Sequence, residues 1–453
     1  MNEFIFREYD IRGIVENDFP QEVVFDLGRA FGTYVKNKNK NVVLVSGDIR
    51  ITTPKLKEWF CNGLLSCGVN VIDAGIVPTP TNYFSMFHYD IDAAVQITGS
   101  HNPSNYNGFK LSFDKKAFYG EQIQELKNII KNQLYYKSND GTIVLKEIIE
   151  DYNNDIINKI KINKPLNVAM DCGNAAACLV APEIYKRLGI KITELFCNVD
   201  GTFPNHHPDP TVDKNLESIV EIIKSGNYNF GVAFDGDADR VVVVDEKGRI
   251  IRSDILMAIF LPEIISKGDK IIYDVKCSKA LEDEILRLNG HPIIWKTGHS
   301  LIKDKMRLEN SKFGGEMSGH IFFADDFYGF DDAVYVSLRL AQLLSNSEQK
   351  LSSIVDKIPK YYSTPELRFE CIDDNEKFII SNKAFEYFSN HYNCDTIDGV
   401  RINFDDGWGL VRASNTQPVI VCRFEAKTMI RMEEIKKQIL DKLSEYGDIQ
   451  IEF

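Results

Sequence analysis

NVVLVSGDIR, at residues 41–50, is a β-branched run that ends in a polar turn. A segment of helical period follows at 54–68, and two further strand-like runs, GVNVIDAG at 68–75 and DAAVQITGS at 92–100, complete the unit. Short strands that alternate with amphipathic helices are typical of βαβ units, whose strands pair in parallel. The unit therefore predicts a mostly parallel sheet with helices on both faces.

The same order of three strand-like runs occurs twice more along the chain. The six further runs are LNVAMDCGN (166–174), LGIKITELF (188–196), FGVAFDGDAD (230–239), KIIYDVKCS (270–278), GHPIIWKTG (290–298) and FGGEMSGH (313–320). In each unit the third run leads directly into a polar loop, TGSHNP, DGDADR or GEMSGH. Open α/β sheets bind ligands beyond the carboxyl ends of their strands, so we expect three related domains to direct three loops into one cleft.

The chain changes character after residue 360. VRINF (400–404), LVRAS (410–414) and PVIVCRFEA (418–426) are predicted to be antiparallel strands, and the charged stretch at 429–443 has the period of a covering helix. The predicted fold class is therefore α/β, with three related mixed α/β domains around a central cleft and a C-terminal α+β domain. The predicted domains are residues 1–146, 147–248, 249–360 and 361–453.

The composition excludes several classes of protein. At 453 residues, the chain is too long for one ordinary core. Its net charge of −13 argues against a surface that coats nucleic acid, because such surfaces need clustered Lys and Arg. The N-terminus has no apolar signal region, and the apolar run at 255–265 is too short to span a membrane. The nine cysteines form no C-x-x-C pair and are interpreted as reduced thiols, so a cytoplasmic protein is expected.

The loop TGSHNPSNYNGFK (98–110) allows two interpretations. An ordinary surface turn would account for its Gly, Asn and Pro residues. Alternatively, the turn presents Ser100 as a nucleophile, which His101 and Asn102 orient and which the positive charge of Lys110 supports.

The loop DGDADR places Asp235, Asp237 and Asp239 at alternate positions. Oxygen ligands suit a hard cation such as Mg²⁺, and a compact loop of three carboxylates needs a positive charge. An EF-hand is disfavoured, because its glycine position holds Arg240 and both flanks are strand-like. A solvated acidic turn or a set of helix caps is the simpler alternative. Beside a metal, Arg240 would help to hold an anion.

The loop RASNTQP (412–418) gathers Arg412, Ser414, Asn415 and Thr416. A guanidinium, hydroxyls and outward main-chain N–H groups together can bind a phosphate, although the same residue types also form ordinary turns. The chain has no P-loop and no G-x-G-x-x-G before a helix, so neither ATP nor a dinucleotide is expected.

The loop GEMSGH carries Glu316, Ser318 and His320. A carboxylate beside a hydroxyl suits vicinal sugar hydroxyls, and a histidine can move a proton near neutral pH, but glycine-flanked polar loops are also common. Lys276 and His299 lie at the ends of two other predicted strands, where each alone is more typical of an ordinary capping residue.

Two further segments have weaker signals. FREYDIRG places Tyr9 and Arg12 before the first strand, where a charged N-terminal arm is the simpler interpretation. The adjacent His206 and His207 in PNHHPDP lack the usual spacing of zinc ligands, so a zinc site is disfavoured.

In this order and over essentially the whole chain, FREYDIRG, TGSHNPSNYNGFK, DGDADR, GGEMSGH and RASNTQP resemble the motifs of the α-D-phosphohexomutase superfamily. The likeness is greatest to its bacterial phosphomannomutase/phosphoglucomutase group. It implies four domains around a central cleft, the last resembling the TATA-binding-protein fold. It also implies an isomerase that moves a phosphoryl group between the 1- and 6-positions of mannose or glucose phosphate, through a phosphoserine and a hexose 1,6-bisphosphate.

The resemblance also assigns roles to residues. Ser100 would be the phosphoserine, and with Asp235, Asp237 and Asp239 it would hold one Mg²⁺ per chain. Further catalytic residues would be Arg12, His101, Lys110, His299 and His320. Residues that bind substrate would be Tyr9, Arg240, Lys276, Glu316, Ser318, His320, Arg412, Ser414, Asn415 and Thr416. One small departure is Ala238, where many members of the family have glycine.

This assignment leaves several questions open. The general base could be Lys110, His299 or His320. A clamp that grips only the sugar O3 and O4 would not distinguish mannose from glucose, so dual activity is predicted. Alternatives are a phosphoglucosamine mutase, a serine-based phosphatase and a sugar-phosphate sensor without turnover. The expected partners are hexose phosphates, with the 1,6-bisphosphate as activator, and neither nucleic acid nor membrane; a monomer or weak dimer is expected.

Overall fold

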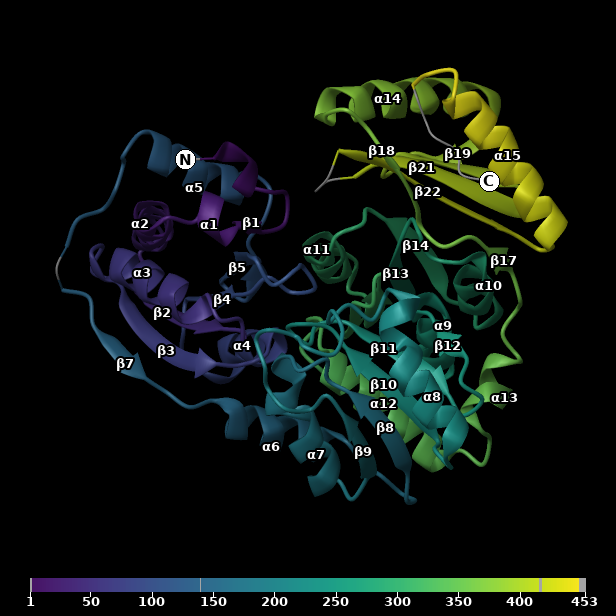
Figure 1. The fold of residues 1–453 in the computed structure, drawn as a ribbon, viewed down its shortest axis with the longest axis horizontal. Helices are drawn as coiled ribbons and strands as arrows, with labels where there is room; N and C mark the ends of the chain where they lie inside the picture. Colours follow the sequence, from purple (N-terminus) through teal and green to yellow (C-terminus); the bar gives the residue numbers. More distant parts are fainter. Residues whose placement is uncertain (1, 139, 415–417, 448–453) are drawn as a thin grey trace. The chain divides into compact units, whose positions relative to one another are not determined.

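The computed structural model of the protein describes residues 2–138, 140–414 and 418–447 (Figure 1). The chain divides into two compact units. Unit 1 comprises Met1–Leu256 and Ser318–Val355, and unit 2 comprises Met257–Met317 and Asp356–Phe453.

The first sheet of unit 1 has the strand order β1-β5-β4-β2-β3-β7, with β6 paired to β5. Its strands are β1 (Ile11–Ile14), β2 (Val42–Gly47), β3 (Asn70–Ile76), β4 (Ala93–Ile97), β5 (Tyr106–Phe113), β6 (Lys116–Ala117) and β7 (Ile143–Leu145). β4, β2 and β3 are parallel, as predicted, and β7, which was not predicted, is parallel to β3, whereas β5 runs antiparallel to β4 and β1. Only residues 98–105 separate β4 from β5, and so short a connection cannot form the crossover that parallel strands need.

Helices cover both faces of this sheet. Alternate residues of β2 explain the arrangement: Val43 and Val45 belong to one core cluster together with Leu27 of α2, whereas Leu44 belongs to another with Met86 of α4. The helices of this part are η1 (Glu3–Ile5), α1 (Val15–Asp18), α2 (Gln21–Asn37), α3 (Thr53–Leu65), α4 (Thr79–His88) and α5 (Glu121–Lys131).

The second sheet of unit 1 has the order β12-β11-β10-β8-β9. Its strands are β8 (Asn167–Asp171), β9 (Lys191–Leu195), β10 (Phe230–Phe234), β11 (Val241–Asp245) and β12 (Ile250–Ile251). β10, β8 and β9 are parallel, and the loop DGDADR joins β10 to the antiparallel β11. The remaining elements of unit 1 are α6 (Ile149–Lys159), η2 (Ala176–Leu179), α7 (Ala181–Arg187), η3 (Asp213–Leu216), α8 (Glu217–Ser225), β16 (Ile321–Phe323), α12 (Ala333–Asn346) and α13 (Leu351–Val355).

Unit 2 begins within α9 (Ser253–Ile264), the apolar helix that contains Pro262. Three parallel strands follow, in the order β14-β13-β15. These strands and their helices are β13 (Lys270–Asp274), α10 (Lys279–Arg287), β14 (His291–Trp295), α11 (His299–Glu309) and β15 (Phe313–Gly315). In this part of the chain the predicted βαβ pattern is confirmed.

The C-terminal part of unit 2 is an antiparallel sheet in the order β17-β22-β21-β20-β19, with β18 paired to β22. Its elements are β17 (Tyr362–Ser363), β18 (Leu367–Glu370), α14 (Asp374–His391), β19 (Asn393–Asp395), β20 (Val400–Phe404), β21 (Gly407–Ala413), β22 (Val419–Ala426) and α15 (Met429–Leu443). α14 and α15 lie over this sheet (Figure 1), and buried residues of both helices and of the sheet form one core cluster. The expected α+β organisation is confirmed.

The fold places the predicted loops at the ends of strands. β4, β10 and β15 end at Ile97, Phe234 and Gly315, directly before the serine, aspartate and glutamate loops. Among the described residues, no helix combines the length and the apolar character needed to cross a membrane.

Candidate active site

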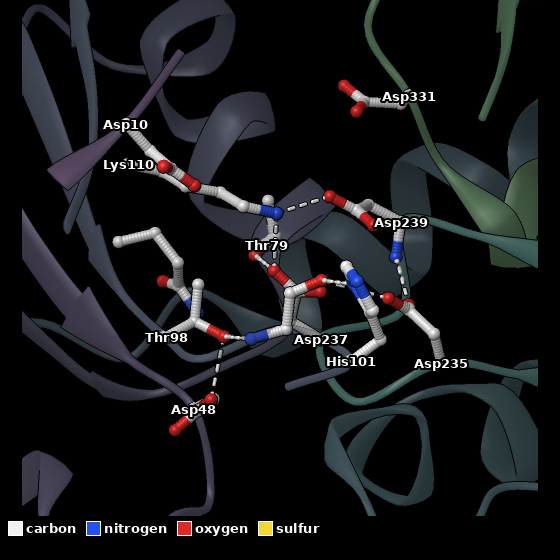
Figure 2. Close-up of polar contacts among 12 residues, drawn as sticks. Asp10, Asp48, Thr79, Thr98, His101, Lys110, Asp235, Asp237, Asp239 and Asp331 are labelled. Atoms are coloured by element: carbon white, nitrogen blue, oxygen red, sulfur yellow. Dashed lines mark hydrogen bonds and ion pairs between the residues drawn. The ribbon is translucent and has the colours of Figure 1, made fainter. Parts of the chain in front are cut away.

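Ser100 lies in the loop after β4, in a left-handed backbone conformation with φ of 49°. Its buried hydroxyl donates a hydrogen bond to Asp235 Oδ2 at 3.0 Å, and its Oγ lies 3.4 Å from His101 Nδ1. A Cβ atom on Gly236 would lie 2.1 Å from the carbonyl oxygen of Ser100, so only glycine permits this approach. The candidate nucleophile therefore lies directly against the acidic loop, whose three aspartates are labelled in Figure 2.

The three carboxylates of the acidic loop are fully buried, and each offers an oxygen within 4.8 Å of the others. Burial, together with repulsion from Asp239 and Asp237, raises the pKa of Asp235 well above its usual value. In the described part of the chain, Oδ1 of Asp237 and Oδ1 of Asp239 have no hydrogen-bond partner. Buried carboxylate oxygens with free lone pairs fit a hard cation such as Mg²⁺.

Lys110 projects from β5 towards the same carboxylates (Figure 2). Its Nζ donates to Asp237 Oδ2 at 2.7 Å and also to Asp239 Oδ2, while Thr79 Oγ1 donates to Asp237 Oδ2 at 2.5 Å. Burial alone would lower the pKa of Lys110, but the attraction of Asp237 and Asp239 outweighs it and raises the pKa. In this structure Lys110 is therefore the charge partner of Asp237 and Asp239.

Arg12 reaches the serine loop from β1. Its Nη1 donates to Asn102 Oδ1 at 2.5 Å, and its Nη2 pairs with Asp10 at 2.5 Å. Tyr9 is half-buried just before this strand. β1 pairs with β5, so the antiparallel hairpin that carries Lys110 also brings Arg12 to the site.

His320 lies between Arg240 and two carboxylates. Arg240 Nε donates to His320 Nε2 at 2.9 Å, and His320 Nδ1 lies 3.0 Å from Asp331 Oδ2 and 3.6 Å from Asp239 Oδ1. Because Nε2 accepts this hydrogen bond, we assign the ring proton to Nδ1, which faces Asp331. The imidazole is thereby held beside the acidic loop. Ser318, also in unit 1, is half-buried.

Two buried residues after β2 contact the serine loop but were not predicted as site residues. Asp48 Oδ2 accepts hydrogen bonds from Thr98 Oγ1 at 2.6 Å and Gly99 N at 3.2 Å, and the guanidinium of Arg50 donates to carbonyl oxygens of the same loop. Both residues stand in GDIR, at the carboxyl end of a strand, and this position is the signal that could have identified them. Thr79 and Asp331 carry no comparable signal.

The paired histidines have a supporting place in unit 1. His207 Nε2 contacts the carbonyl oxygen of His101, and His206 Nε2 lies 3.0 Å from Asp171 Oδ2. Burial, together with the nearby Arg240 and other cations, lowers the pKa of His101 well below its usual value, so its ring is neutral. Neither His206 nor His207 is among the groups of described residues whose ligand atoms converge as they would around a metal.

The sugar-binding candidates of unit 2 lie beside the strand ends. Glu316 is buried, and its Oε1 accepts a hydrogen bond from Gly298 N at 2.5 Å. His299 follows Gly298 in the chain and is the first residue of α11. Lys276 pairs with Glu366 at 3.2 Å; burial alone would lower the pKa of Lys276, but the attraction of Glu366 outweighs it and raises the pKa.

The phosphate-binding candidates of unit 2 lie at the end of β21, with Arg412 inside the strand and Ser414 directly after it. Arg412 is buried and pairs with Asp398 at 3.1 Å, and the main-chain N–H of Ser414 donates to β22 at 3.0 Å. Asn415 and Thr416 lie outside the described residues. The guanidinium of Arg412 is therefore paired with a carboxylate in this structure.

Comparison with known proteins finds matches to one protein family along nearly the whole chain. Residues 3–137, 150–248 and 252–362 match phosphoglucomutase/phosphomannomutase alpha/beta/alpha domains I, II and III, and residues 348–442 match the C-terminal domain of the same family. The chain is 42% identical to a phosphomannomutase/phosphoglucomutase of Pseudomonas putida, over 95% of this chain and 94% of that protein.

Solved structures agree with this match. A phosphoglucomutase/phosphomannomutase family protein of Burkholderia thailandensis has a TM-score of 0.92 and 36% identity, with both chains covered completely. An N-acetylphosphoglucosamine mutase of Aspergillus fumigatus, solved with glucose 1,6-bisphosphate, has a TM-score of 0.64 at 12% identity, covers 98% of this chain and 95% of that chain, and so shares the fold. The chain belongs to the phosphoglucomutase/phosphomannomutase family and is an enzyme of the isomerase class.

Proposed function

We propose that this enzyme interconverts hexose 1-phosphates and hexose 6-phosphates by phosphoryl transfer through Ser100. The observation that carries the proposal is the 3.0 Å contact between the Ser100 hydroxyl and Asp235, which places a nucleophile against a buried acidic loop. The proposed domains are residues 1–146, 147–248, 249–360 and 361–453, and each contributes one of the loops described above.

Asp235, Asp237 and Asp239, together with phosphorylated Ser100, would hold one Mg²⁺ per chain. When bound, it would neutralise charge on the transferred phosphoryl group. The chain supplies further positive charge of its own. Lys110 is an ammonium group that contacts two of these carboxylates, and Arg12 borders the serine loop. Together with the metal, these cations would reduce the repulsion between the phosphoserine and a phosphosugar.

In the forward step, the bond between Ser100 Oγ and phosphorus breaks while a free 1- or 6-hydroxyl of the bound sugar forms a new bond to phosphorus. The hydroxyl proton passes to a general base. The hexose 1,6-bisphosphate then turns around and returns its other phosphate to Ser100. The same bisphosphate would act as an activator, because it can phosphorylate an enzyme that has lost its phosphate.

Of the three candidate bases, Lys110 is the least suitable because it is already an ammonium group. We propose His320 for the base within unit 1: Nδ1 faces Asp331, and Nε2, which accepts a hydrogen bond from Arg240 in this structure, would take the proton once Arg240 turns towards substrate. His299 is the corresponding candidate in unit 2. His101 would orient Ser100 through its 3.4 Å contact.

Sugar and phosphate recognition is assigned to polar residues of both units. Glu316 and Ser318 would bind the sugar O3 and O4. The remaining substrate-binding residues would be Tyr9, Arg240, Lys276, His320, Arg412, Ser414, Asn415 and Thr416. A clamp on O3 and O4 ignores the C2 centre, so we propose activity on both mannose and glucose phosphates. We also propose a cytoplasmic monomer or weak dimer that binds neither nucleic acid nor membrane.

The reaction class is tested by incubating the protein with glucose 1-phosphate and measuring both glucose 6-phosphate and inorganic phosphate. A mutase yields the isomer with little free phosphate. Release of phosphate without isomer would indicate a phosphatase, and binding without conversion would indicate a sensor.

The choice of sugar is tested by comparing kcat/KM for mannose 1-phosphate, glucose 1-phosphate and glucosamine 1-phosphate. We expect the mannose and glucose values to be similar and the amino-sugar value to be lower. A strong preference for glucosamine 1-phosphate would replace the proposed specificity with that of a phosphoglucosamine mutase.

A further inference from the structure

The backbone of the serine loop requires external support. Ser100 adopts φ of 49°, a conformation that is unfavourable for a residue with a Cβ atom. The loop at 98–105 is too short to contain regular secondary structure, yet Ser100 is buried. Its carbonyl groups therefore need hydrogen-bond donors from elsewhere in the protein.

Arg50 supplies these donors from a single side chain. Its Nη1 donates to the carbonyl oxygens of Pro103 at 2.6 Å and Tyr106 at 3.0 Å, and its Nη2 donates to those of Ser100 at 2.8 Å and Asn102 at 2.6 Å. A guanidinium group is planar and rigid, so three contacts to the loop and one to the first residue of β5 fix the relative positions of these carbonyls. The side chain of Arg50 is only 1% exposed.

Asp48 completes the arrangement on the other side of Ser100. Its Oδ2 lies 3.3 Å from Arg50 Nε and accepts hydrogen bonds from Thr98 Oγ1 and Gly99 N. A Cβ atom on Gly99 would lie 2.5 Å from the central carbon of the guanidinium, so the loop packs directly onto Arg50. The charge of the buried arginine is thus balanced by a buried carboxylate.

We infer that Arg50 is a positioning residue for phosphoryl transfer, because its guanidinium holds the Ser100 loop in the conformation that places the hydroxyl against Asp235. The inference rests on the proposed role of Ser100. Arg50 itself lies behind the loop and contacts only its main chain. A lysine at this position offers one ammonium group and cannot span four carbonyls.

The test compares Arg50→Lys with Arg339→Lys. Arg339 is also a buried arginine of unit 1, paired with Asp325 through both Nη atoms, and its side chain is 8% exposed. We expect kcat of Arg50→Lys to fall by about 100-fold with KM changed by less than about threefold, because a misplaced nucleophile slows chemistry more than binding. Arg339→Lys should lose thermal stability and keep its kcat.

A second variant covers the case in which Arg50→Lys does not fold. Gly99→Ala keeps Arg50 in the sequence, but the added methyl group displaces the guanidinium from the loop. This variant should therefore show the same selective loss of kcat. Both variants should also take up phosphate from glucose 1,6-bisphosphate more slowly. The intact mass of the protein measures this transfer. A kcat within about threefold of the parent for the folded variants would overturn the inference.

Ser100→Ala separates this inference from the proposed function. If Ser100→Ala still isomerises glucose 1-phosphate, the proposed function fails, and the inference fails with it. If Ser100→Ala is inactive while Arg50→Lys keeps full kcat, the proposed function stands and only the positioning role of Arg50 is wrong.

Discussion

The serine loop after β4 and the acidic loop after β10 occupy corresponding positions in two domains, but they are held by opposite means. The serine loop has its main chain fixed by a buried arginine and aspartate from the preceding strand end. The acidic loop has three buried carboxylates whose nearest cation is Lys110. One loop is ordered by the chain itself, whereas the other needs additional positive charge. Loss of the metal's charge should therefore affect the acidic loop more than the serine loop.

Removal of divalent cations should give the largest difference between the two loops. We expect chelation with EDTA to reduce activity by at least about 1,000-fold, with recovery on adding Mg²⁺, because phosphoryl transfer depends on charge neutralisation. Hydrogen exchange should become faster at residues 235–240, and less so at 98–105, where Arg50 and Asp48 still hold the main chain. Equal acceleration in both loops would contradict the difference proposed here.

Substitution of Lys110 tests how far its ammonium group stabilises the acidic loop. Lys110→Met leaves Asp237 and Asp239 without their ammonium partner, and breaking a buried pair in this way should lower the free energy of unfolding in EDTA by about 4 kcal/mol. The same change should tighten Mg²⁺ binding, measured by calorimetry, because the carboxylates then have no competing cation. The control is Lys57→Met, which removes a pair with Asp73 away from this loop. Weaker Mg²⁺ binding in Lys110→Met would show that Lys110 supports the metal site.

Asp332 shows how a buried carboxylate behaves without a cation. Burial raises its pKa to about 7, although hydrogen bonds from Tyr335 N and Tyr152 Oη oppose this shift. The folded protein therefore keeps a proton on Asp332 that the unfolded chain releases near pH 4. Its contribution to stability is complete below about pH 4 and is lost as the pH rises to 7, by about 4 kcal/mol.

Asp332→Asn checks this pH dependence. Asparagine retains the N-cap of α12 and cannot ionise, so the difference in unfolding free energy between parent and variant should change between pH 4 and 7. A constant difference over this range would mean that Asp332 is ionised throughout.

The smallest effect is expected at Ala238, within the acidic loop. Its φ is 63°, a left-handed conformation that glycine adopts without strain. Ala238→Gly should raise the free energy of unfolding by roughly 0.5 kcal/mol, since relief of strain slightly exceeds the added entropy of the unfolded chain. Denaturant unfolding of parent and variant measures this. A clear loss of stability would mean that the Ala238 methyl group contributes packing.

Much of the fold follows from the sequence because periodicity marks faces and strand ends. The strand at 400–404 and the helix at 429–443 were predicted with the bounds that the structure shows. The loops after β4, β10 and β15 were identified for the same reason: apolar strands end abruptly in polar residues. Local patterns of this kind need no knowledge of distant contacts.

The support of the site could not be predicted in the same way. Thr79 contacts Asp237 across 158 positions of the chain, and Asp331 meets His320 through packing that no local motif marks. The antiparallel direction of β5, which brings Lys110 to the carboxylates, depends on the pairing of β5 with β4 and β1. Such contacts depend on strand order, which residue periodicity leaves open.

The most direct test of the account is to locate the phosphate on the enzyme. The parent protein is incubated with glucose 1,6-bisphosphate, its intact mass is measured, and the modified peptide is sequenced. The account predicts a gain of about 80 Da, for one phosphate, on Ser100 and no gain in Ser100→Ala. A phosphate that persists in Ser100→Ala, or a parent that isomerises glucose 1-phosphate without ever carrying phosphate, would contradict it.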